Sequence, residues 1–435
     1  MVRNPNNTPE EGGPKGGISS VTQKLPFWTT LLFFLYNFDS KLITDMKKIF
    51  LILLAAVLLP LVLSAQQAIF TKEGVCSPQI NEDNSVTFRI YAPKAVKVEV
   101  TGDCFANEQG GWGKAGLTEG EGGVWTLTTG PLDSELYSYA FIVDGQQMLD
   151  PSNVFLMRDV RSLMNIFIVP GEKGDLYNVC KTSHGTVSKV WYDSPSLGMQ
   201  RRMTVYTPAG YEDSGNKRYP VLYLLHGMGG DEEAWVTLGR AAQVLDNLIA
   251  QGKAEPMIVV MPNGNAGLPS APGEGPEGLY QPMTRPMKTM EGSYEAAFMD
   301  IVDYVDSHYR TIRKKSGRAI AGLSMGGFHS FHISKQYENM FDYVGLFSAA
   351  VRNPENGVGG IYEDFDSKIA RQFANGLRLY YIAIGNTDFL YEENTKLRSY
   401  LDEHDYPYVY VETDGGHIWR NWRIYLTDFA SRIFK

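Results

Sequence analysis

Short runs of alternating apolar and polar residues mark the chain from about residue 69 to residue 169. In one run Val96, Val98 and Val100 share one face, as in a strand with a single buried side. Similar runs lie at residues 85–92, 125–128 and 136–143. The last run is followed by Asp144-Gly145, a dipeptide typical of tight hairpin turns. Short strands at this spacing, separated by Gly, Pro and Asp, predict an all-β sandwich.

The pattern changes after a polar connector at residues 171–187. From residue 188 to residue 435, short apolar runs alternate with longer segments of helical periodicity, which predicts a mostly parallel sheet covered by helices on both faces. The expected strands are 221–225, 257–261, 318–322, 344–348, 379–384 and 408–413. The expected helices are 241–251, 294–309, 325–337, 391–404 and 421–434. The fold class is therefore α/β, with the β-sandwich at residues 66–170 in front of it.

One segment of the α/β region, residues 264–290, has no periodicity and is rich in Gly, Pro and Met. A loop of this length within a compact domain is typically functional. We expect it to act as a lid or a pocket wall.

Length and charge narrow the possible partners. The chain has 435 residues, more than one ordinary core supports, which agrees with two domains. Its formal net charge is -9 and no stretch concentrates Lys and Arg, which argues against nucleic acid because phosphate neutralisation needs a basic surface. We therefore expect a neutral substrate or an uncharged polymer.

The N-terminal region has the pattern of a targeting segment. A basic start at Met46 precedes an apolar run at residues 49–63, and small residues follow, which predicts a secretory signal peptide at residues 46–65. Pro60 within the run and the lack of a basic flank after it argue against a membrane-spanning helix. We interpret residues 1–45 as an upstream over-extension, with a membrane-associated leader as the alternative. The protein is thus expected to be exported, to the periplasm or outside the cell.

The three cysteines are Cys76, Cys104 and Cys180. An odd number in an exported chain permits at most one internal disulfide and leaves one thiol over. None lies near the motifs described next, so we expect structural roles for them and no thiol nucleophile.

Gly322-Leu323-Ser324-Met325-Gly326 fits the G-x-S-x-G pattern. Two glycines around a serine recur by chance, but this element follows an apolar strand and precedes a helical segment, the context that makes the pattern specific. Small residues permit the tight turn that lifts the serine hydroxyl to the carboxyl end of a sheet. We therefore predict that Ser324 is a nucleophile, with an ordinary Gly/Ser turn as the alternative.

A serine nucleophile needs a base and an acid that orients the base, and on this fold the order along the chain is Ser, acid, His. Of the seven histidines, His417 is the best candidate base because it follows a strand in a Gly-rich loop late in the chain. Asp388 follows the preceding strand and is the candidate acid. Asp402, Asp405 and Asp414 are weaker competitors, the first two at a helix end and the third too close to His417. A helix-capping role is the alternative for Asp388.

The segment from His226 to Gly230 directly follows the strand expected at residues 221–225. Its glycines let the backbone approach a developing oxyanion, and we expect the N–H groups of Met228 and Met325 to form the oxyanion hole. The loop lacks the G-x-G-x-x-G spacing and the G-K-[ST] ending of nucleotide sites.

Together these motifs resemble the esterase D group and, more narrowly, carbohydrate esterase family one, which includes feruloyl esterases and acetyl xylan esterases. The resemblance covers residues 184–435 and rests on His226-Gly227-Met228-Gly229-Gly230, Met261-Pro262-Asn263-Gly264, Gly322-Leu323-Ser324-Met325-Gly326-Gly327, Gly385-Asn386-Thr387-Asp388 and Gly416-His417. Residues 77–170 are similar to the immunoglobulin-like early-set domains of family 48 carbohydrate-binding modules, on strand pattern and on Phe88-Arg89-Ile90-Tyr91-Ala92-Pro93.

The resemblance implies an α/β-hydrolase fold and hydrolysis of feruloyl or acetyl esters on plant cell-wall xylan through an acyl-enzyme. In that mechanism His417 deprotonates Ser324, and the N–H groups of Met228 and Met325 hold the oxyanion. Water activated by His417 then releases the acid. The implied partner is feruloylated or acetylated arabinoxylan, and neither a metal nor an organic cofactor is needed.

The sequence leaves the acyl group open. His226, Gly227, Trp235 and Trp419 are candidate substrate contacts, and aromatic residues such as Trp235, Tyr280 and Trp419 either line a cinnamoyl pocket or pack in a core. For the β-domain a glycan-binding role, with Trp112 or Trp125 stacking on sugars, rests on analogy. A brace or a pocket lid is the alternative.

Three other functions fit parts of the pattern. A siderophore esterase of the enterochelin type shares a β-domain before the hydrolase, although the expected signal peptide argues against an enzyme of the cell interior. An acyltransferase related to the mycolyl transferases shares the fold. A non-catalytic polysaccharide-binding protein on a hydrolase scaffold is disfavoured by the intact serine, aspartate and histidine set.

Overall fold

The computed structural model describes residues 75–105, 111–276, 289–352 and 360–435. The expected signal peptide at 46–65, the segment 1–45 and Tyr280 lie outside the described residues. In the part of the chain that is described, no helix is long and apolar enough to cross a membrane.

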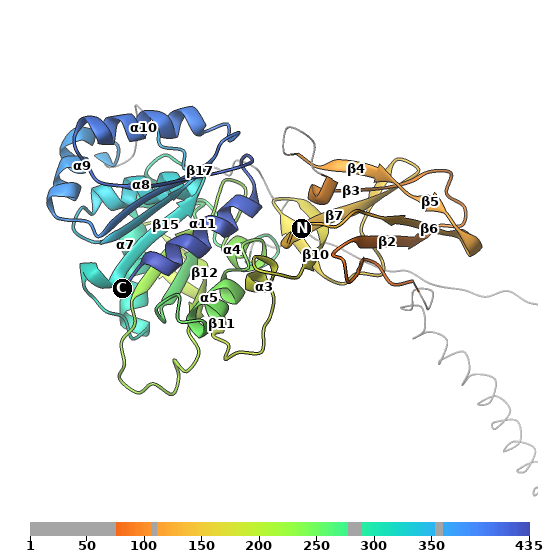
Figure 1. The fold of residues 1–435 in the computed structure, drawn as a ribbon. Helices are drawn as coiled ribbons and strands as arrows, with labels where there is room; N and C mark the ends of the chain where they lie inside the picture. Colours follow the sequence, from red (N-terminus) through yellow and green to blue (C-terminus); the bar gives the residue numbers. More distant parts are fainter. Residues whose placement is uncertain (1–74, 106–110, 277–288, 353–359) are drawn as a thin grey trace, which may run out of the picture. The chain divides into compact units, whose positions relative to one another are not determined.

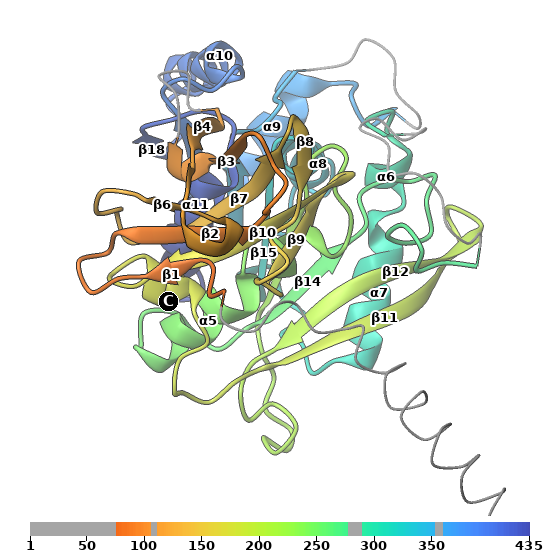
Figure 2. The same cartoon turned by 90° about the vertical axis from the view of Figure 1, so that its right-hand side faces the viewer.

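The N-terminal part is a β-sandwich of two antiparallel sheets, as the alternating pattern predicts (Figures 1 and 2). One sheet has the strand order β1-β2-β6-β5, and the other β4-β3-β7-β10-β9, with β8 paired to β7. The strands are β1 (Gln79–Ile80), β2 (Val86–Tyr91), β3 (Val98–Gly102), β4 (Gly113–Gly116), β5 (Thr118–Glu119), β6 (Val124–Thr128), β7 (Glu135–Val143), β8 (Gln146–Met148), β9 (Leu156–Asp159) and β10 (Ser162–Val169). Aromatic rings fill the space between the sheets. The ring centroid of Phe88 lies 5.0 Å from that of Tyr139 and 5.6 Å from that of Phe167.

Two details of the sandwich bear on the sequence predictions. Val143 pairs with Gln146, so Asp144-Gly145 forms the two-residue hairpin turn, with φ of 48° and 85°. Val96 does not share the buried face, because it is 86% exposed and precedes β3. Its N–H donates to Asp144 Oδ1 at 2.9 Å, which places it in the approach to the strand.

The two tryptophans considered for sugar stacking lie in different surroundings. Trp125 is buried, and its Nε1–H donates to Ala92 O at 3.0 Å, so it is a core residue of the sandwich. Trp112 is 38% exposed.

The connector at residues 171–187 is packed and not free. It contains the short helix α3 (Gly174–Tyr177), and Tyr177 is buried in the apolar core of the following domain. The buried Asn247 Nδ2 lies 3.0–3.1 Å from the carbonyl oxygens of Asp175, Leu176 and Asn178, to which it donates. The connector is therefore packed onto α5 (Ala241–Ala250) and forms part of the α/β domain.

The second part contains an eight-stranded sheet with the order β11-β12-β14-β13-β15-β16-β17-β18. Its strands are β11 (Thr186–Ser194), β12 (Met199–Thr207), β13 (Val221–Leu225), β14 (Ile258–Pro262), β15 (Arg318–Leu323), β16 (Tyr343–Phe347), β17 (Leu379–Gly385) and β18 (Val409–Thr413). The pairs from β14 to β18 are parallel, whereas β11 and β12 pair antiparallel at the edge. The six expected strands are present within one or two residues. The sequence pattern missed β12 because the buried Arg201 and Arg202 interrupt its apolar run.

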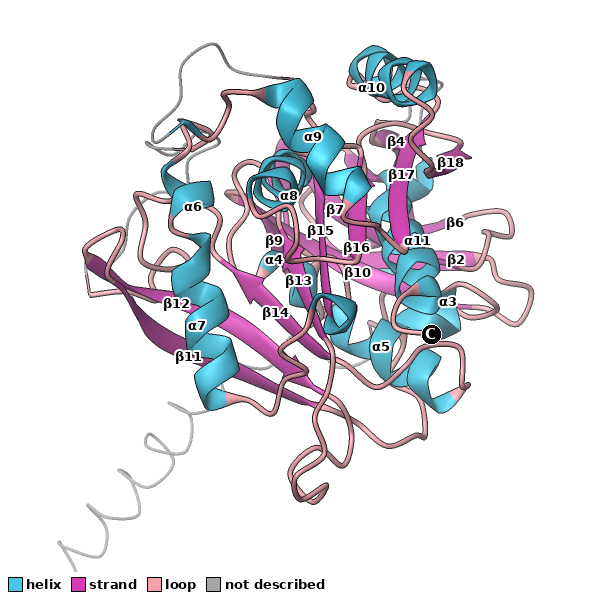
Figure 3. Cartoon of the chain, turned by 90° about the vertical axis from the view of Figure 1, so that its left-hand side faces the viewer, coloured by secondary structure: helices cyan, strands magenta, loops and turns pink. Residues whose placement is uncertain are grey.

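Helices cover both faces of this sheet, as predicted (Figure 3). They are α4 (Ala234–Thr237), α5 (Ala241–Ala250), α6 (Ser293–Ala296), α7 (Phe298–His308), α8 (Met325–Gln336), α9 (Phe365–Ala374), α10 (Tyr391–Glu403) and α11 (Trp419–Arg432). One core joins α4, α5 and α11 to the sheet, and the other joins α7, α8, α9 and α10 to its opposite face. The helix expected at 294–309 is split into α6 and α7, and α9 was not expected.

The sandwich and the α/β domain belong to one compact unit, residues 72–435. Four apolar residues of the sandwich, Leu136, Met157, Met164 and Ile166, are buried in the same core as α5 and α11. Arg423 of α11, 3% exposed at its side chain, pairs with Glu135 of β7 at 3.1 Å. The apolar core of the α/β domain therefore extends into the sandwich, and a buried ion pair lies at the same contact.

Candidate active site

Ser324 stands at the turn between β15 and α8. Its backbone has φ 54° and ψ -115°, a conformation that side-chain-bearing residues rarely adopt. A Cβ at Gly322 would lie 2.3 Å from Gly326 O, and one at Gly326 would lie 2.2 Å from Leu225 O. Both glycines are therefore required by close backbone approach, and the turn presents Ser324 at the carboxyl end of the parallel strands.

His417 and Asp388 come together from two neighbouring strand ends. His417 follows β18, and its Nδ1 lies 2.8 Å from Asp388 Oδ2 and 3.0 Å from Oδ1. The Asp388 side chain is fully buried, and its Oδ1 also accepts from Leu390 N at 2.9 Å. Since an ionised carboxylate only accepts hydrogen bonds, Nδ1 carries the proton and Nε2 is left as the basic nitrogen. Leu390 directly precedes α10, so the Asp388 carboxylate contacts both the imidazole and the start of this helix.

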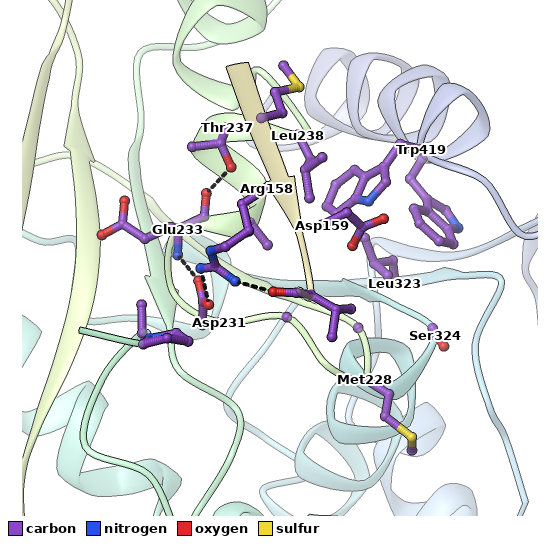
Figure 4. Close-up of a pocket in the computed structure, with 18 of the residues that line it drawn as sticks. Arg158, Asp159, Met228, Asp231, Glu233, Thr237, Leu238, Leu323, Ser324 and Trp419 are labelled. Atoms are coloured by element: carbon purple, nitrogen blue, oxygen red, sulfur yellow. Dashed lines mark hydrogen bonds and ion pairs between the residues drawn. The ribbon is translucent and has the colours of Figure 1, made fainter. Parts of the chain in front are cut away.

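Ser324 and His417 line one cavity of about 420 Å³ (Figure 4). No direct hydrogen bond joins them in the described part of the chain, a geometry that is common before a substrate is bound. The cavity also contains Gly227, Met228 and Trp419. Five of the residues expected at the site thus share one space.

The loop after β13 approaches Ser324 closely. A Cβ at Gly227 would lie 2.4 Å from Leu323 Cδ1 and 3.4 Å from Ser324 Cβ, so only glycine fits there. Met228 follows and faces the cavity, while Met325 begins α8, where the first backbone N–H groups have no acceptor within the helix. The loop and the helix N-terminus can therefore direct two N–H groups at an oxyanion.

His226 lies behind this loop and not in the cavity. It is 1% exposed, its Nε2 accepts from Gly264 N at 2.7 Å and its Nδ1 donates to Gly227 O at 2.8 Å. Burial lowers the pKa of His226 to about 4, so the ring is neutral near pH 7. With both nitrogens engaged, His226 positions Gly227 and has no group left for a substrate, which differs from the expected contact.

Trp235 is likewise a core residue. It is 1% exposed, and its Nε1–H donates to Leu225 O at 2.9 Å. Its ring meets the Trp419 ring edge-on, with centroids 5.4 Å apart. Trp235 therefore supports Trp419, which does line the cavity.

A buried polar framework under the loop was missed in the sequence. Arg201 donates to Asn263 O at 2.7 Å and to Asn265 O at 2.9 Å, and Asn265 Nδ2 donates to Gly230 O at 2.9 Å. Arg202 pairs with Glu232 at 2.7 Å. The signal in the sequence was two adjacent arginines in an otherwise apolar stretch, since buried arginines need such partners.

The sandwich contributes to the cavity, which sequence reasoning also missed. Arg158, Asp159 and Val160, at the end of β9, line it together with Ser324 (Figure 4). Arg158 forms an ion pair with Asp231 at 2.5 Å. The run Arg158-Asp159 carried no periodicity or motif, so only the tertiary contact reveals it.

The rest of the cavity wall has an apolar part and a polar part. Its apolar members include Leu156, Met157, Leu238, Leu323, Trp419 and Trp422, and its polar members are Lys189, Asp231, Glu233, Thr237 and Glu274. A second cavity, of about 1160 Å³, shares Asp159, Val160, Leu238, His417, Trp419 and Trp422 with the first. His417 thus stands where the two spaces meet.

The three cysteines are free and none of them lines either cavity. Within the described residues, no group of three or more His, Cys, Asp or Glu side chains could hold a metal ion.

Residues 194–376 match the protein family described as "Putative esterase", and residues 76–156 match carbohydrate-binding module 48, the isoamylase N-terminal domain. Residues 194–376 are thus similar to this esterase family, and residues 76–156 are similar to the family 48 module. The expected resemblance and the expected α/β fold behind a β-sandwich are therefore confirmed.

Curated relatives of this chain agree with that similarity. It is 35% identical over 283 residues to the endo-1,4-beta-xylanase/feruloyl esterase of Xylanibacter ruminicola, covering 64% of the chain and 37% of the relative. It is 29% identical over 217 residues to an esterase of Mycobacterium tuberculosis, covering 48% of the chain and 41% of the relative. The chain thus spans about two fifths of the curated relatives it matches.

Among solved structures, the enterobactin esterase of Shigella flexneri, determined in the presence of enterobactin, matches with a TM-score of 0.56. The match covers 80% of this chain and 92% of that one at 17% identity. This likeness concerns the fold.

Proposed function

We propose that this esterase hydrolyses carboxylic esters through an acyl-enzyme on Ser324, with His417 as the base and Asp388 as the residue that orients it. The observation that carries the proposal is the pairing of His417 Nδ1 with the buried Asp388 carboxylate at 2.8 Å, in the cavity wall that also holds Ser324. That arrangement fits a base whose free nitrogen can serve the serine hydroxyl.

In the first half of the reaction, His417 Nε2 takes the proton of the Ser324 hydroxyl as its oxygen attacks the ester carbonyl. The backbone N–H groups of Met228 and Met325 stabilise the negative charge on the carbonyl oxygen, a contribution of about 3 kcal/mol for one donor. His417 then gives the proton to the leaving alcohol. In the second half, water attacks the acyl-enzyme with His417 again as base.

The acyl group that fits this cavity is an aromatic one. A space of about 420 Å³ with Trp419, Trp422 and Leu238 in its wall is larger than an acetyl group can fill. The relative named endo-1,4-beta-xylanase/feruloyl esterase is 35% identical over the matched segment, which supports a feruloyl ester on xylan. Acetyl removal is the alternative.

The alcohol side of such an ester needs its own space. Because His417 Nε2 takes the proton of Ser324 and then gives it to the leaving alcohol, that alcohol lies beside Nε2, at the edge of the imidazole that faces away from Asp388. The larger cavity begins there and is lined by residues of both domains, including Trp112 and Arg161. It has room for sugar units of a polysaccharide. An exported protein would meet such a polymer, in agreement with the predicted signal peptide.

The test is hydrolysis of methyl ferulate, acetylated xylan and 4-nitrophenyl acetate by the full chain, beside its Ser324→Ala form. We expect ferulate release by the native chain and none by the variant. Cleavage of acetyl groups alone would keep the mechanism and change the acyl group. Enterobactin as a further substrate tests the siderophore alternative, and binding to xylan without cleavage of any ester would favour the non-catalytic one.

A further inference from the structure

The wall of the acyl cavity is completed by a strand of the carbohydrate-binding module. Strand β9 ends at Asp159, and the cavity is lined by Arg158, Asp159 and Val160 together with Ser324. Figure 4 shows Arg158 and Asp159 on either side of the strand end, with Asp159 next to Trp419. Without β9 the cavity would be open on this side.

The module packs against the α/β domain through buried contacts, which hold β9 in place as part of the cavity wall. Met157 of β9 is 5% exposed and belongs to the same core as Leu238 and Trp235. The buried pair of Arg423 and Glu135 lies at the same interface. Apolar burial and a buried ion pair together favour one defined position over a loose tether.

Arg158 connects strand β9 to the loop after β13, which we call the oxyanion loop because it includes Met228 and Gly230. Its guanidinium contacts Asp231 Oδ2 at 2.5 Å and donates to Val160 O at 2.9 Å. Asp231 directly follows Gly230, is 6% exposed at its side chain, and accepts from Glu233 N at 3.0 Å. Arg158 is therefore a positioning residue that acts on both β9 and the loop.

Asp159 is a polar group of the wall that lies next to Trp419, and it lines both cavities. It is half-buried and takes part in a hydrogen bond with Trp419, whose indole can only donate. Burial raises the pKa of Asp159, against the opposing effect of Arg158, and the nearby Asp231 raises it further. One donor leaves acceptor positions of the carboxylate free, so the site favours a second donor.

We propose, on the basis of the proposed ester hydrolysis, that β9 of the module is part of the acyl-binding site and that Asp159 accepts a hydrogen bond from the ring hydroxyl of a hydroxycinnamoyl group. The ring lies along the apolar wall at Trp419 and Leu238, and its hydroxyl meets the carboxylate where the two cavities join. The module then determines which acyl group is accepted, in addition to any contact with a polysaccharide.

The experiment compares kcat/KM for methyl ferulate, which has the ring hydroxyl, with kcat/KM for methyl cinnamate, which lacks it. The full chain is tested with Asp159→Leu and Asp159→Asn, and Glu119→Gln, an exposed carboxylate on β5, is the matched control. We expect Asp159→Leu to lower the ratio of ferulate to cinnamate by about tenfold or more, because a hydrogen bond to a charged group is lost. Asp159→Asn, which keeps an acceptor oxygen, should restore part of the ratio, and the control should not change it.

Binding gives a second readout that does not depend on turnover. In the Ser324→Ala background, Asp159→Leu should weaken equilibrium binding of methyl ferulate by about the same factor and affect methyl cinnamate much less. An unchanged ratio, or equal losses on both esters, would overturn the role of Asp159. If the native chain cleaves 4-nitrophenyl acetate and cinnamate but shows no preference for ferulate, the hydrolase stands and this inference fails. If it cleaves no ester, both fail.

Discussion

Arg158 in the module and Asp231 in the loop after β13 form an ion pair of 2.5 Å at the edge of the cavity that contains Ser324. The Asp231 side chain is 6% exposed and that of Arg158 is 29% exposed, so the pair is largely removed from water. Two segments that are 73 residues apart in the sequence are thereby joined at the site. This ion pair therefore connects the module directly to the loop after β13.

Breaking this pair should affect every ester alike. Arg158→Met leaves the Asp231 carboxylate buried without its partner, and we expect kcat to fall by about three- to thirtyfold on ferulate, cinnamate and acetate esters. A double-mutant cycle with Asp231→Asn, read by urea unfolding, should give a coupling of about 1–3 kcal/mol. The exposed pair of Arg371 and Glu338 is the control, with a coupling of about 0–1 kcal/mol. A coupling near that of the control would contradict the link.

Asp388→Asn should reduce kcat for all esters by about 10³- to 10⁴-fold with little change in KM. The amide can donate to His417 Nδ1, which favours the tautomer with the proton on Nε2 and removes the base. Asp405→Asn, at a residue with φ 57° that asparagine tolerates, tests a competing aspartate and should leave kcat within about twofold. Equal losses in the two variants would refute the assignment of the acid.

The strained backbone of Ser324 should appear in stability. At φ 54° and ψ -115° a side chain costs about 1–3 kcal/mol that glycine does not incur. We therefore expect Ser324→Gly to unfold at higher urea than Ser324→Ala, although glycine loses more entropy on folding. At Ser330, inside α8, the order should reverse, with Ala more stable than Gly by about 1 kcal/mol. If the Ala variant is more stable than the Gly variant at both positions, the backbone of Ser324 is not strained.

Lys335 predicts a pH-dependent stability. It lies on α8, is fully buried, and has no hydrogen-bond partner at Nζ within the described residues, although the ammonium lies 4.2 Å from the Phe365 ring centroid. Burial lowers the pKa of Lys335 from 10.5 to about 7. Between these values the unfolded chain binds more protons, so this group makes stability rise with pH.

Lys335→Met should remove that rise and stabilise the protein at pH 7 by about 1–4 kcal/mol, because a buried ammonium is replaced by an apolar chain of similar length. The measurement is urea unfolding at neutral and at alkaline pH. Lys396→Met, at an exposed position of α10, should change neither the stability nor its slope with pH. If the free energy of unfolding of Lys335→Met still rises with pH, a group other than Lys335 causes the rise.

Much of the fold could be read from local patterns. The parallel strands β13 to β17 appear as short apolar runs because both of their faces are buried. Asp144-Gly145 marks its hairpin because only such residues adopt positive φ at little cost. Strand β12 was missed for the opposite reason. Its buried Arg201 and Arg202 interrupt the apolar signal, and their partners Glu232, Asn263 and Asn265 lie 30 to 64 residues away in the sequence.

The candidate site divides in the same way. Ser324, Asp388 and His417 follow from the sequence alone, because the nucleophile turn and the strand ends impose glycine and a fixed chain order. His226 was mistaken for a substrate contact, since only the tertiary structure shows both ring nitrogens bonded to the backbone. Arg158 and Asp159 have no motif, and their place beside Ser324 arises from the burial of Met157 in the esterase core. The sequence by itself thus predicted the candidate residues, because they depend on local backbone geometry, whereas the packing of two domains decided the shape of the pocket.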